Sequence, residues 1–337
     1  MLIFCGSRRK VRMRVFISCI AHSTFCWLFI LGGHCLGAEK RANGKVKVFV
    51  LSGQSNMVGF GQVTNPKNQR GTMEFYTKEF PDKYGHLMGR RGKPEERKDV
   101  WVVSLGQVEK SGWLTTGFGK SDNQIGPEYA FGQVIGDYFE DPVVLIKVAW
   151  GGRSLFHNFL PPSAEDYPEP EKDGDKGFEY HELVRQVKLV TSDLKEYFPK
   201  YRGGGYELLG LGWHQGWNDR VSKKGVEIYE GNLVHLVEDL RKDLEAEDLP
   251  FVVANTGMQS KQNYAGRVKK KAEEFMDSQL AITKKRKYQN IGGVDTREFW
   301  RPVEESPSGQ NYHWNQNWES YFLIGEAMGN EMLKFLE

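Results

Sequence analysis

Ser55 lies directly after a short apolar segment that is typical of a buried β-strand. The segment Val46–Leu51 reads VKVFVL, and the residues from Gly53 to Met57 read GQSNM. Ligands of parallel α/β sheets bind beyond the carboxyl ends of the strands, which is where this serine is placed. The sequence therefore predicts that Ser55 is a nucleophile. The alternative role for its hydroxyl group is to cap a short helix.

Three more polar clusters are found farther along the chain. WGGRSL and WHQGWNDR each end an apolar segment, and YHWN precedes the last predicted helix; they span Trp150–Leu155, Trp213–Arg220 and Tyr312–Asn315. The carboxyl ends of parallel strands meet at one edge of a sheet. We therefore expect these clusters to converge around Ser55.

The residue types in these clusters suit acyl transfer. That reaction needs a hydroxyl nucleophile, a base and hydrogen-bond donors for the developing oxyanion. We expect His313 to be the base and the backbone N–H groups of Ser55 and Gly152 to be two of the donors. A glycine permits close approach of the substrate. A side-chain amide, from Asn218 or from Gln215, is the expected third donor.

Four residues of the clusters are candidates for substrate binding, namely Gln54, Arg153, Trp217 and Trp314. Aromatic faces beside polar groups suit sugar rings, and a guanidinium can bind the carboxylate of an acidic sugar. Both ideas have alternatives, because tryptophans also pack in cores and Arg153 could pair with an internal acid. His214 is expected to pack beneath the site.

Apolar segments and segments with helical spacing alternate along the chain. This alternation favours an α/β fold, a three-layer α/β/α sandwich with a central parallel sheet of about five strands. Two long stretches, residues 61–126 and 161–177, lack the pattern and are interpreted as loops. The predicted strands are 46–51, 142–149, 208–213, 250–254 and 291–294, and the predicted helices are 128–139, 182–198, 225–244, 266–284 and 318–336.

The four clusters, taken together and in this order, resemble a known family. The chain is similar to SGNH-type hydrolases of the carbohydrate esterase family six and sialate O-acetylesterase-like group. The resemblance extends from Leu51 to about Met328. It implies the flavodoxin-like SGNH hydrolase fold and the removal of acetyl groups from sugars.

The resemblance also implies roles for single residues. Ser55 matches the nucleophile of the family, Gly152 the glycine of the second block and His313 the histidine. The Gly-x-Asn-Asp block matches Gly216–Asp219.

The carboxylate that orients the histidine in such enzymes is missing from both of its usual positions. Gln310 occupies the position three residues before His313, and Trp217 occupies the position after His-Gln-Gly. Asp219 is the nearest acid within the blocks and is the candidate for the third triad member, or else a surface partner of Arg220. The amide oxygen of Gln310 could also orient the imidazole. Acids on the approach to the histidine are Asp295, Glu304 and Glu305.

Residues 1–38 are expected to be a secretory signal peptide, followed by a single domain of residues 39–337. The leader has five Lys/Arg and no acid, then an apolar stretch to Leu36 and the small residues Gly37-Ala38. An uncleaved membrane anchor is the alternative. All four cysteines lie in the leader, so we expect neither disulfides nor a cysteine metal site beyond it. We expect no metal and no organic cofactor.

The chain has 46 Lys+Arg against 44 Asp+Glu, and five of the basic residues are in the leader. This balance gives no reason to expect nucleic acid as a partner. The sequence predicts a secreted or periplasmic serine esterase, without stable membrane insertion after leader cleavage. The expected substrate is an acetylated oligo- or polysaccharide, such as acetylxylan or a sialate, cleaved through an acetyl-serine intermediate. The alternatives are a carbohydrate-binding homologue with little or no turnover, and a lipid esterase on the same fold.

Overall fold

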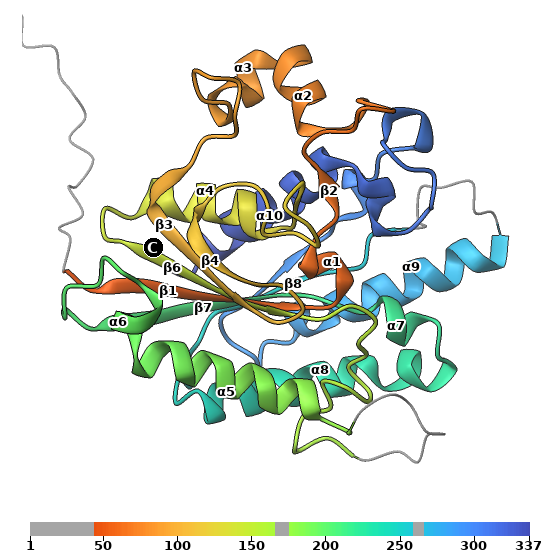
Figure 1. Cartoon of the computed structure of the whole chain (residues 1–337). Coiled ribbons are helices and arrows are strands. Elements are labelled where there is room, and N and C mark those ends of the chain that lie inside the picture. Colours follow the sequence, from red (N-terminus) through yellow and green to blue (C-terminus); the bar gives the residue numbers. More distant parts are fainter. Residues whose placement is uncertain (1–43, 166–174, 259–265) are drawn as a thin grey trace, which may run out of the picture. The chain divides into compact units, whose positions relative to one another are not determined.

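A seven-stranded sheet runs through the centre of the computed structural model, which describes residues 44–165, 175–258 and 266–337 (Figure 1). The strand order is β4-β3-β6-β1-β7-β8-β9, and every neighbouring pair is parallel except β3 and β4. All five predicted strands are confirmed. The bounds are β1 Val46–Gly53, β3 Arg97–Leu105, β4 Glu109–Leu114, β6 Val143–Ala149, β7 Tyr206–His214, β8 Phe251–Ala254 and β9 Ile291–Val294.

The strands β3 and β4 are the part of the sheet that the sequence did not predict. They lie within residues 61–126, which had been interpreted as a loop. In β3 the apolar run is only Val100–Val103, with charged residues before it. The edge strand β4 reads EKSGWL, and only its last residue is buried. A half-exposed antiparallel edge strand does not need a continuous apolar run. The same stretch also contains short elements, β2 Gly61–Gln62, α2 Met73–Glu79, α3 Pro81–Tyr84, η1 Gly85–Leu87 and β5 Gln124–Ile125.

Helices cover both faces of the sheet and complete the predicted three-layer α/β/α sandwich (Figure 1). On one face α4 and α10 pack side by side, and on the other face lie α5 and α8. The bounds are α1 Ser55–Val58, α4 Glu128–Tyr138, α5 Phe178–Ser192, α6 Leu194–Tyr197, α7 Trp217–Arg220, α8 Lys223–Asp243, α9 Gly266–Leu280 and α10 Trp318–Leu333. The 3₁₀ helices of the second half are η2 Ala281–Lys284, η3 Arg297–Phe299, η4 Val303–Glu305 and η5 His313–Gln316.

The central strand β1 shows why two layers of helices are needed. All eight of its residues are buried. Side chains alternate between the faces of a strand, so Phe49 and Leu51 join the core beneath α4 and α10. Val48 and Val50 join the core beneath α5 and α8. A strand that is apolar on both faces is stable only when both faces are covered.

The helix predicted for residues 182–198 is divided in two at Asp193. Asp193 has φ −135° and ψ 59°, which are not helical angles, and its side chain accepts a hydrogen bond from the N–H of Glu196. Asp is a favoured N-cap because its carboxylate binds an N–H group that has no partner within the helix. It therefore ends α5 and begins α6.

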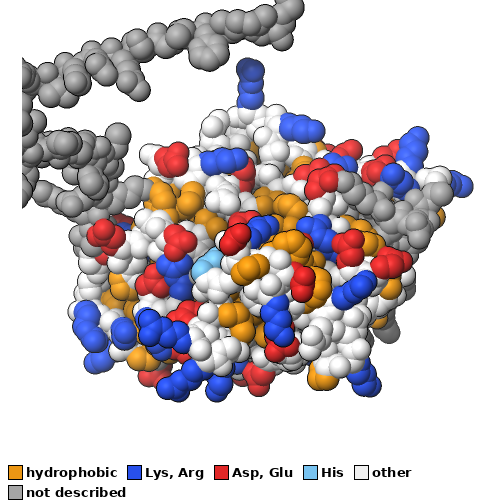
Figure 2. Space-filling model, turned by 90° about the horizontal axis from the view of Figure 1, so that it is seen from above, with side chains coloured by type: hydrophobic (Ala, Val, Ile, Leu, Met, Phe, Trp, Pro, Cys, Tyr) orange, Lys and Arg blue, Asp and Glu red, His pale blue; other side chains and the backbone are white. Residues whose placement is uncertain are grey.

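The residues from 44 onward belong to one unit, Lys40–Glu337. The predicted leader, residues 1–38, lies outside the described residues. Within the described ranges, no helix is long and apolar enough to cross a membrane. The face seen in Figure 2 carries Lys/Arg and Asp/Glu side chains intermixed with hydrophobic ones.

Candidate active site

Ser55 is the first residue of the single-turn helix α1, immediately beyond the carboxyl end of β1. Gly53 makes this turn possible: its φ is 154°, and a Cβ atom there would collide with the carbonyl oxygen of His214. The helix has no side-chain cap, so Ser55 does not act as the N-cap. Ser55 is 9% exposed, and its hydroxyl makes no hydrogen bond with the described residues. The hydroxyl is therefore available to a ligand.

Gln54 joins the serine turn to the loop after β7. Its Oε1 accepts hydrogen bonds from the N–H groups of Gly216 (3.1 Å) and Asn218 (3.3 Å), and its Nε2 donates to Asn218 Oδ1 (3.1 Å). Only 1% of Gln54 is exposed. The expectation that Gln54 contacts substrate is therefore wrong, because its amide is buried and used to hold the two loops together.

Gly152 and Asn218 lie next to the serine turn, as predicted. Asn218 Nδ2 donates to the carbonyl oxygen of Gly152 at 2.8 Å and has a second hydrogen left for a ligand. Gly152 has φ 72° and is exposed, with open space where a side chain would be. The preceding Gly151 approaches the serine: a Cβ placed on it would lie 3.9 Å from the Cβ of Ser55.

Gln107 holds this glycine loop and was not found from the sequence. Its Oε1 accepts a hydrogen bond from the N–H of Gly151 at 2.7 Å. Gln107 lies in the hairpin between β3 and β4, in the stretch interpreted as a loop. A residue in a hairpin whose strands were not recognised could not be placed at the site.

Gln215 is a structural residue and not an oxyanion donor. Its Nε2 donates to Asp219 Oδ2 (2.5 Å), to the carbonyl oxygen of Arg153 (2.9 Å) and to Gln54 Oε1 (3.3 Å). Its Oε1 accepts from the hydroxyl of Tyr229 at 3.1 Å. With 1% exposure and every polar atom in use, it has nothing left to offer an oxyanion. Of the two predicted amide donors, Asn218 has an amide hydrogen that these contacts do not use.

Asp219 is completely buried and holds the segment after the glycine loop. Its Oδ1 accepts hydrogen bonds from the N–H groups of Leu155 (3.0 Å) and Phe156 (3.1 Å), and its Oδ2 accepts from Gln215 Nε2. Burial raises the pKa of Asp219 to about 6, against the lowering effect of these hydrogen bonds. The carboxylate is thus bonded to the backbone of 155–156, and not to His313 as a triad acid would be.

His313 lies at the start of η5 and packs face to face on Phe60. The two ring centroids are 3.9 Å apart with an interplanar angle of 7°, and the ring of Tyr312 contacts the imidazole edge-on at 4.8 Å. Phe60 follows Gly59, which ends the serine helix α1. The stack therefore brings the imidazole to the segment that carries Ser55. Within the described residues no hydrogen bond joins the imidazole to Ser55 or to any carboxylate.

Burial lowers the pKa of His313 to about 4. No acid among the described residues counteracts this shift, which agrees with the empty acid positions in the sequence. The amide oxygen of Gln310 accepts a hydrogen bond from Gln316 Nε2 at 3.4 Å. Asp295 is bonded to Arg297 and, at 3.1 Å, to Asn255 Nδ2. Neither side chain orients the imidazole.

Most of the remaining candidates for substrate contact are buried or already contact other side chains. Trp314 is 0% exposed and packs near Trp300, so the expectation that it stacks on a sugar is wrong. Arg153 forms a 2.5 Å ion pair with Glu179, as the alternative interpretation had it. Trp217 is half-buried, with the guanidinium of Arg220 over its ring at 4.0 Å. His214 is 1% exposed and packs beneath the site, with Nδ1 3.1 Å from the carbonyl oxygen of Ala254.

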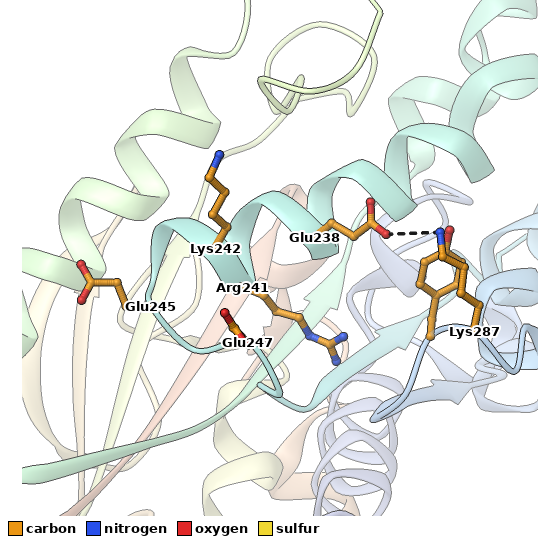
Figure 3. Close-up of a pocket in the computed structure, with 7 residues that line it drawn as sticks. Glu238, Arg241, Lys242, Glu245, Glu247 and Lys287 are labelled. Carbon is orange, nitrogen blue, oxygen red and sulfur yellow. Dashed lines mark ion pairs between the residues drawn. The ribbon is translucent and has the colours of Figure 1, made fainter.

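Surface hollows border both ends of α8. One, of about 690 Å³, lies between the α7–α8 corner and α9 and is lined by Val221, Val226 and Val268 together with Lys223 and Lys271. The other, of about 570 Å³, lies at the carboxyl end of α8, before β8 and β9 begin (Figure 3). It is therefore near the amino ends of the strands, whereas Ser55 lies beyond their carboxyl ends. In Figure 3 Glu238 and Lys287 form an ion pair across it, 4.0 Å apart.

No cluster of His, Cys, Asp or Glu within residues 44–165, 175–258 and 266–337 could hold a metal ion. The polar groups at the carboxyl ends of the strands are the free hydroxyl of Ser55 and the N–H groups of Gly152 and Asn218. The neutral imidazole of His313 lies nearby. Such a set suits acyl transfer.

Solved structures of low sequence identity have the same fold. An Arabidopsis thaliana protein aligns with a TM-score of 0.53 and 19% identity, over 86% of this chain and 98% of that one. NanS aligns with a TM-score of 0.55 and 14% identity, over 87% and 98%. A carbohydrate acetylesterase from Xanthomonas citri aligns with a TM-score of 0.52 and 12% identity, over 84% of this chain and 56% of that one. At such identities the likeness shows the fold alone.

No curated protein matches the sequence. A family profile does match, over residues 45–334, and it is described as carbohydrate esterase, sialic acid-specific acetylesterase. The matched range includes Ser55, Gly152, Asn218 and His313. This chain therefore belongs to the sialic acid-specific acetylesterase family of carbohydrate esterases and is a carboxylic ester hydrolase.

Proposed function

We propose that this protein is a secreted serine esterase that removes O-acetyl groups from a carbohydrate through an acetyl-Ser55 intermediate. The family supports O-acetyl ester hydrolysis as the reaction. The observation that carries the mechanism is the free hydroxyl of Ser55 beside the donors of two other loops, at Gly152 and Asn218. The leader-like segment before the domain supports secretion.

In the proposed reaction Ser55 Oγ attacks the carbonyl carbon of the acetyl ester, and its proton passes to His313. The oxyanion accepts hydrogen bonds from the N–H groups of Ser55 and Gly152 and from Asn218 Nδ2. When the tetrahedral intermediate collapses, the sugar hydroxyl leaves with the proton held by His313. Water, deprotonated by His313, then attacks acetyl-Ser55, and acetate leaves as Ser55 regains its proton.

The surroundings of His313 decide how fast this reaction can be. Its lowered pKa keeps the imidazole neutral at pH 7, which is the form that accepts a proton. Within residues 44–165, 175–258 and 266–337, no carboxylate is placed to stabilise the imidazolium that forms next. Loss of that carboxylate costs about 10⁴ in turnover in serine proteases. We therefore expect slow turnover compared with an enzyme that has a complete triad.

The test is hydrolysis of an aryl acetate by the mature protein and by Ser55→Ala. We expect the parent to hydrolyse the ester and the variant to be reduced to background, with one acetyl group detectable on the peptide containing Ser55 in the parent. Ser121→Ala, which changes an exposed serine, is the matched control. Equal rates for the parent and Ser55→Ala would show that Ser55 is not the nucleophile.

A carbohydrate-binding protein without turnover is the second candidate, because no acid in the described part of the chain is bonded to His313. It predicts that acetylated oligosaccharides bind and are recovered unchanged, by the parent and by Ser55→Ala alike. A lipid esterase predicts a rate that rises with acyl chain length. Our proposal predicts the highest rate for acetyl esters.

A further inference from the structure

Lys147 is a buried lysine that contacts the helix carrying Ser55. It is 2% exposed and lies on β6, in register with Leu51 of β1. Its Nζ donates to the carbonyl oxygens of Val58 (2.8 Å) and Phe118 (2.7 Å) and to Glu128 Oε2 (2.6 Å). An ammonium group has three hydrogens. Each of them therefore has one acceptor, and the group is held in a single position.

Glu128 is the acidic partner of Lys147. It is the first residue of α4, is 0% exposed, and accepts a hydrogen bond from the N–H of Gly126 with its other oxygen at 2.8 Å. Burial lowers the pKa of Lys147 and raises the pKa of Glu128, and the attraction between them opposes both shifts. Removing either partner would leave a buried charge without compensation.

The helix α1 depends on contacts of this kind because it is a single turn. Its four residues are too few to form a stable helix alone. Its carboxyl end approaches the backbone so closely that a Cβ atom on Gly59 would collide with Gly126. The carbonyl of Val58 is one of the terminal groups that a helix cannot satisfy internally, and a cation is favoured there. Lys147 supplies that cation.

We propose that Lys147, held by Glu128, is a positioning residue for Ser55. Its ammonium fixes the carboxyl end of α1 and thereby aims the Ser55 hydroxyl relative to the donors at Gly152 and Asn218. The catalytic consequence rests on the proposed esterase function. A misplacement of about 1 Å at a reacting group can cost about 100-fold in rate.

Lys47 offers a matched control within the same sheet. It is also buried, at 4% exposure, and pairs with Glu207 at 2.6 Å and with Asp141 at 3.3 Å. It lies near the amino end of β1, whereas Ser55 follows the carboxyl end of the same strand. Lys147→Met and Lys47→Met thus both remove a buried lysine from an ion pair, but only the first removes a contact with α1.

The experiment compares both variants by amide hydrogen exchange of residues 57–59 and by the steady-state kinetics of aryl acetate hydrolysis. In Lys147→Met we expect exchange in α1 to be at least about ten-fold faster. We also expect kcat to fall by about ten- to 100-fold, with KM changed by less than about three-fold. In Lys47→Met we expect exchange in α1 and kcat to stay within about two-fold of the parent, although the Tm falls.

Exchange in α1 at the parent rate in Lys147→Met would overturn the proposal, and so would equal changes in the two variants. If Lys147→Met does not fold, Glu128→Asp replaces it. The shorter carboxylate cannot reach both Lys147 and Gly126. We therefore expect a smaller increase in exchange in α1 and a smaller decrease in kcat than in Lys147→Met. Parent values for Glu128→Asp would overturn the proposal as well. The exchange result holds even if Ser55→Ala shows no loss of hydrolysis, so failure of the esterase function is recognised separately.

Discussion

The imidazole of His313 lies flat on the phenyl ring of Phe60, with ring centroids 3.9 Å apart and planes within 7° of parallel. In a serine hydrolase with a complete triad, a carboxylate bonded to the histidine sets the orientation of the ring. Here aromatic contacts hold the ring, with Phe60 against its face and Tyr312 edge-on. Because only Gly59 separates Phe60 from α1, the stack also brings the ring to the segment that carries Ser55.

Replacing Phe60 should therefore affect catalysis through His313. We expect Phe60→Leu to lower kcat about two- to ten-fold, since an aromatic pair contributes about 0.5–1.5 kcal/mol beyond burial. Phe60→Tyr keeps the ring face and should stay near the parent value. Phe75→Leu, in the same hydrophobic core but stacked edge-on with Tyr76, is the control. Parent kinetics for Phe60→Leu would argue against an orienting role.

The pH dependence of hydrolysis should reflect the lowered pKa of His313. Burial favours the neutral imidazole, so the base stays unprotonated from neutral pH down to about pH 4. We expect kcat/KM for an aryl acetate to persist below pH 6 and to fall as the pH decreases through about 4. An acidic limb centred near pH 6.5, the ordinary value for histidine, would contradict this expectation.

Removing the Asn218 amide should weaken oxyanion stabilisation. Loss of one such donor costs about 10²- to 10³-fold in kcat, and we expect Asn218→Ala to fall in this range with a smaller change in KM. Asn123→Ala, which removes an exposed asparagine bonded to Thr64, is the control. A kcat for Asn218→Ala within two- or three-fold of the parent would leave Asn218 without a catalytic role.

The variant Asp219→Asn shows whether this carboxylate is a triad acid or a structural residue. If it only holds the backbone at Leu155 and Phe156, Asp219→Asn should lower the Tm, because the new amide hydrogens face the donating Nε2 of Gln215. Turnover should fall far less than the roughly 10⁴-fold expected for loss of a triad carboxylate. The acidic limb of the pH–rate profile should also stay in place. A 10⁴-fold loss with an unchanged Tm would instead assign Asp219 to the triad.

Pattern and spacing in the sequence were sufficient for the five parallel strands, the helices that cover them and the meeting of the Ser55, Gly152 and Asn218 loops. The elements follow from their apolar patterns, which are local properties of the chain, and the meeting of the loops follows from the general rule that the carboxyl ends of parallel strands lie together. The strands β3 and β4 had no such signal, and Gln107 was missed with them.

Only the tertiary structure shows which groups the polar side chains inside those blocks contact. Gln54 and Gln215 have residue types that suit a substrate or an oxyanion, and Asp219 has the type of a triad acid. All three are buried and hydrogen-bonded within or between the loops after β1 and β7. Trp314 had the type for sugar stacking and is fully covered. Burial and hydrogen-bond partners depend on residues far away in the chain. For the same reason the sequence showed that His313 lacks an acid in the usual positions, but could not show that Phe60 contacts its ring.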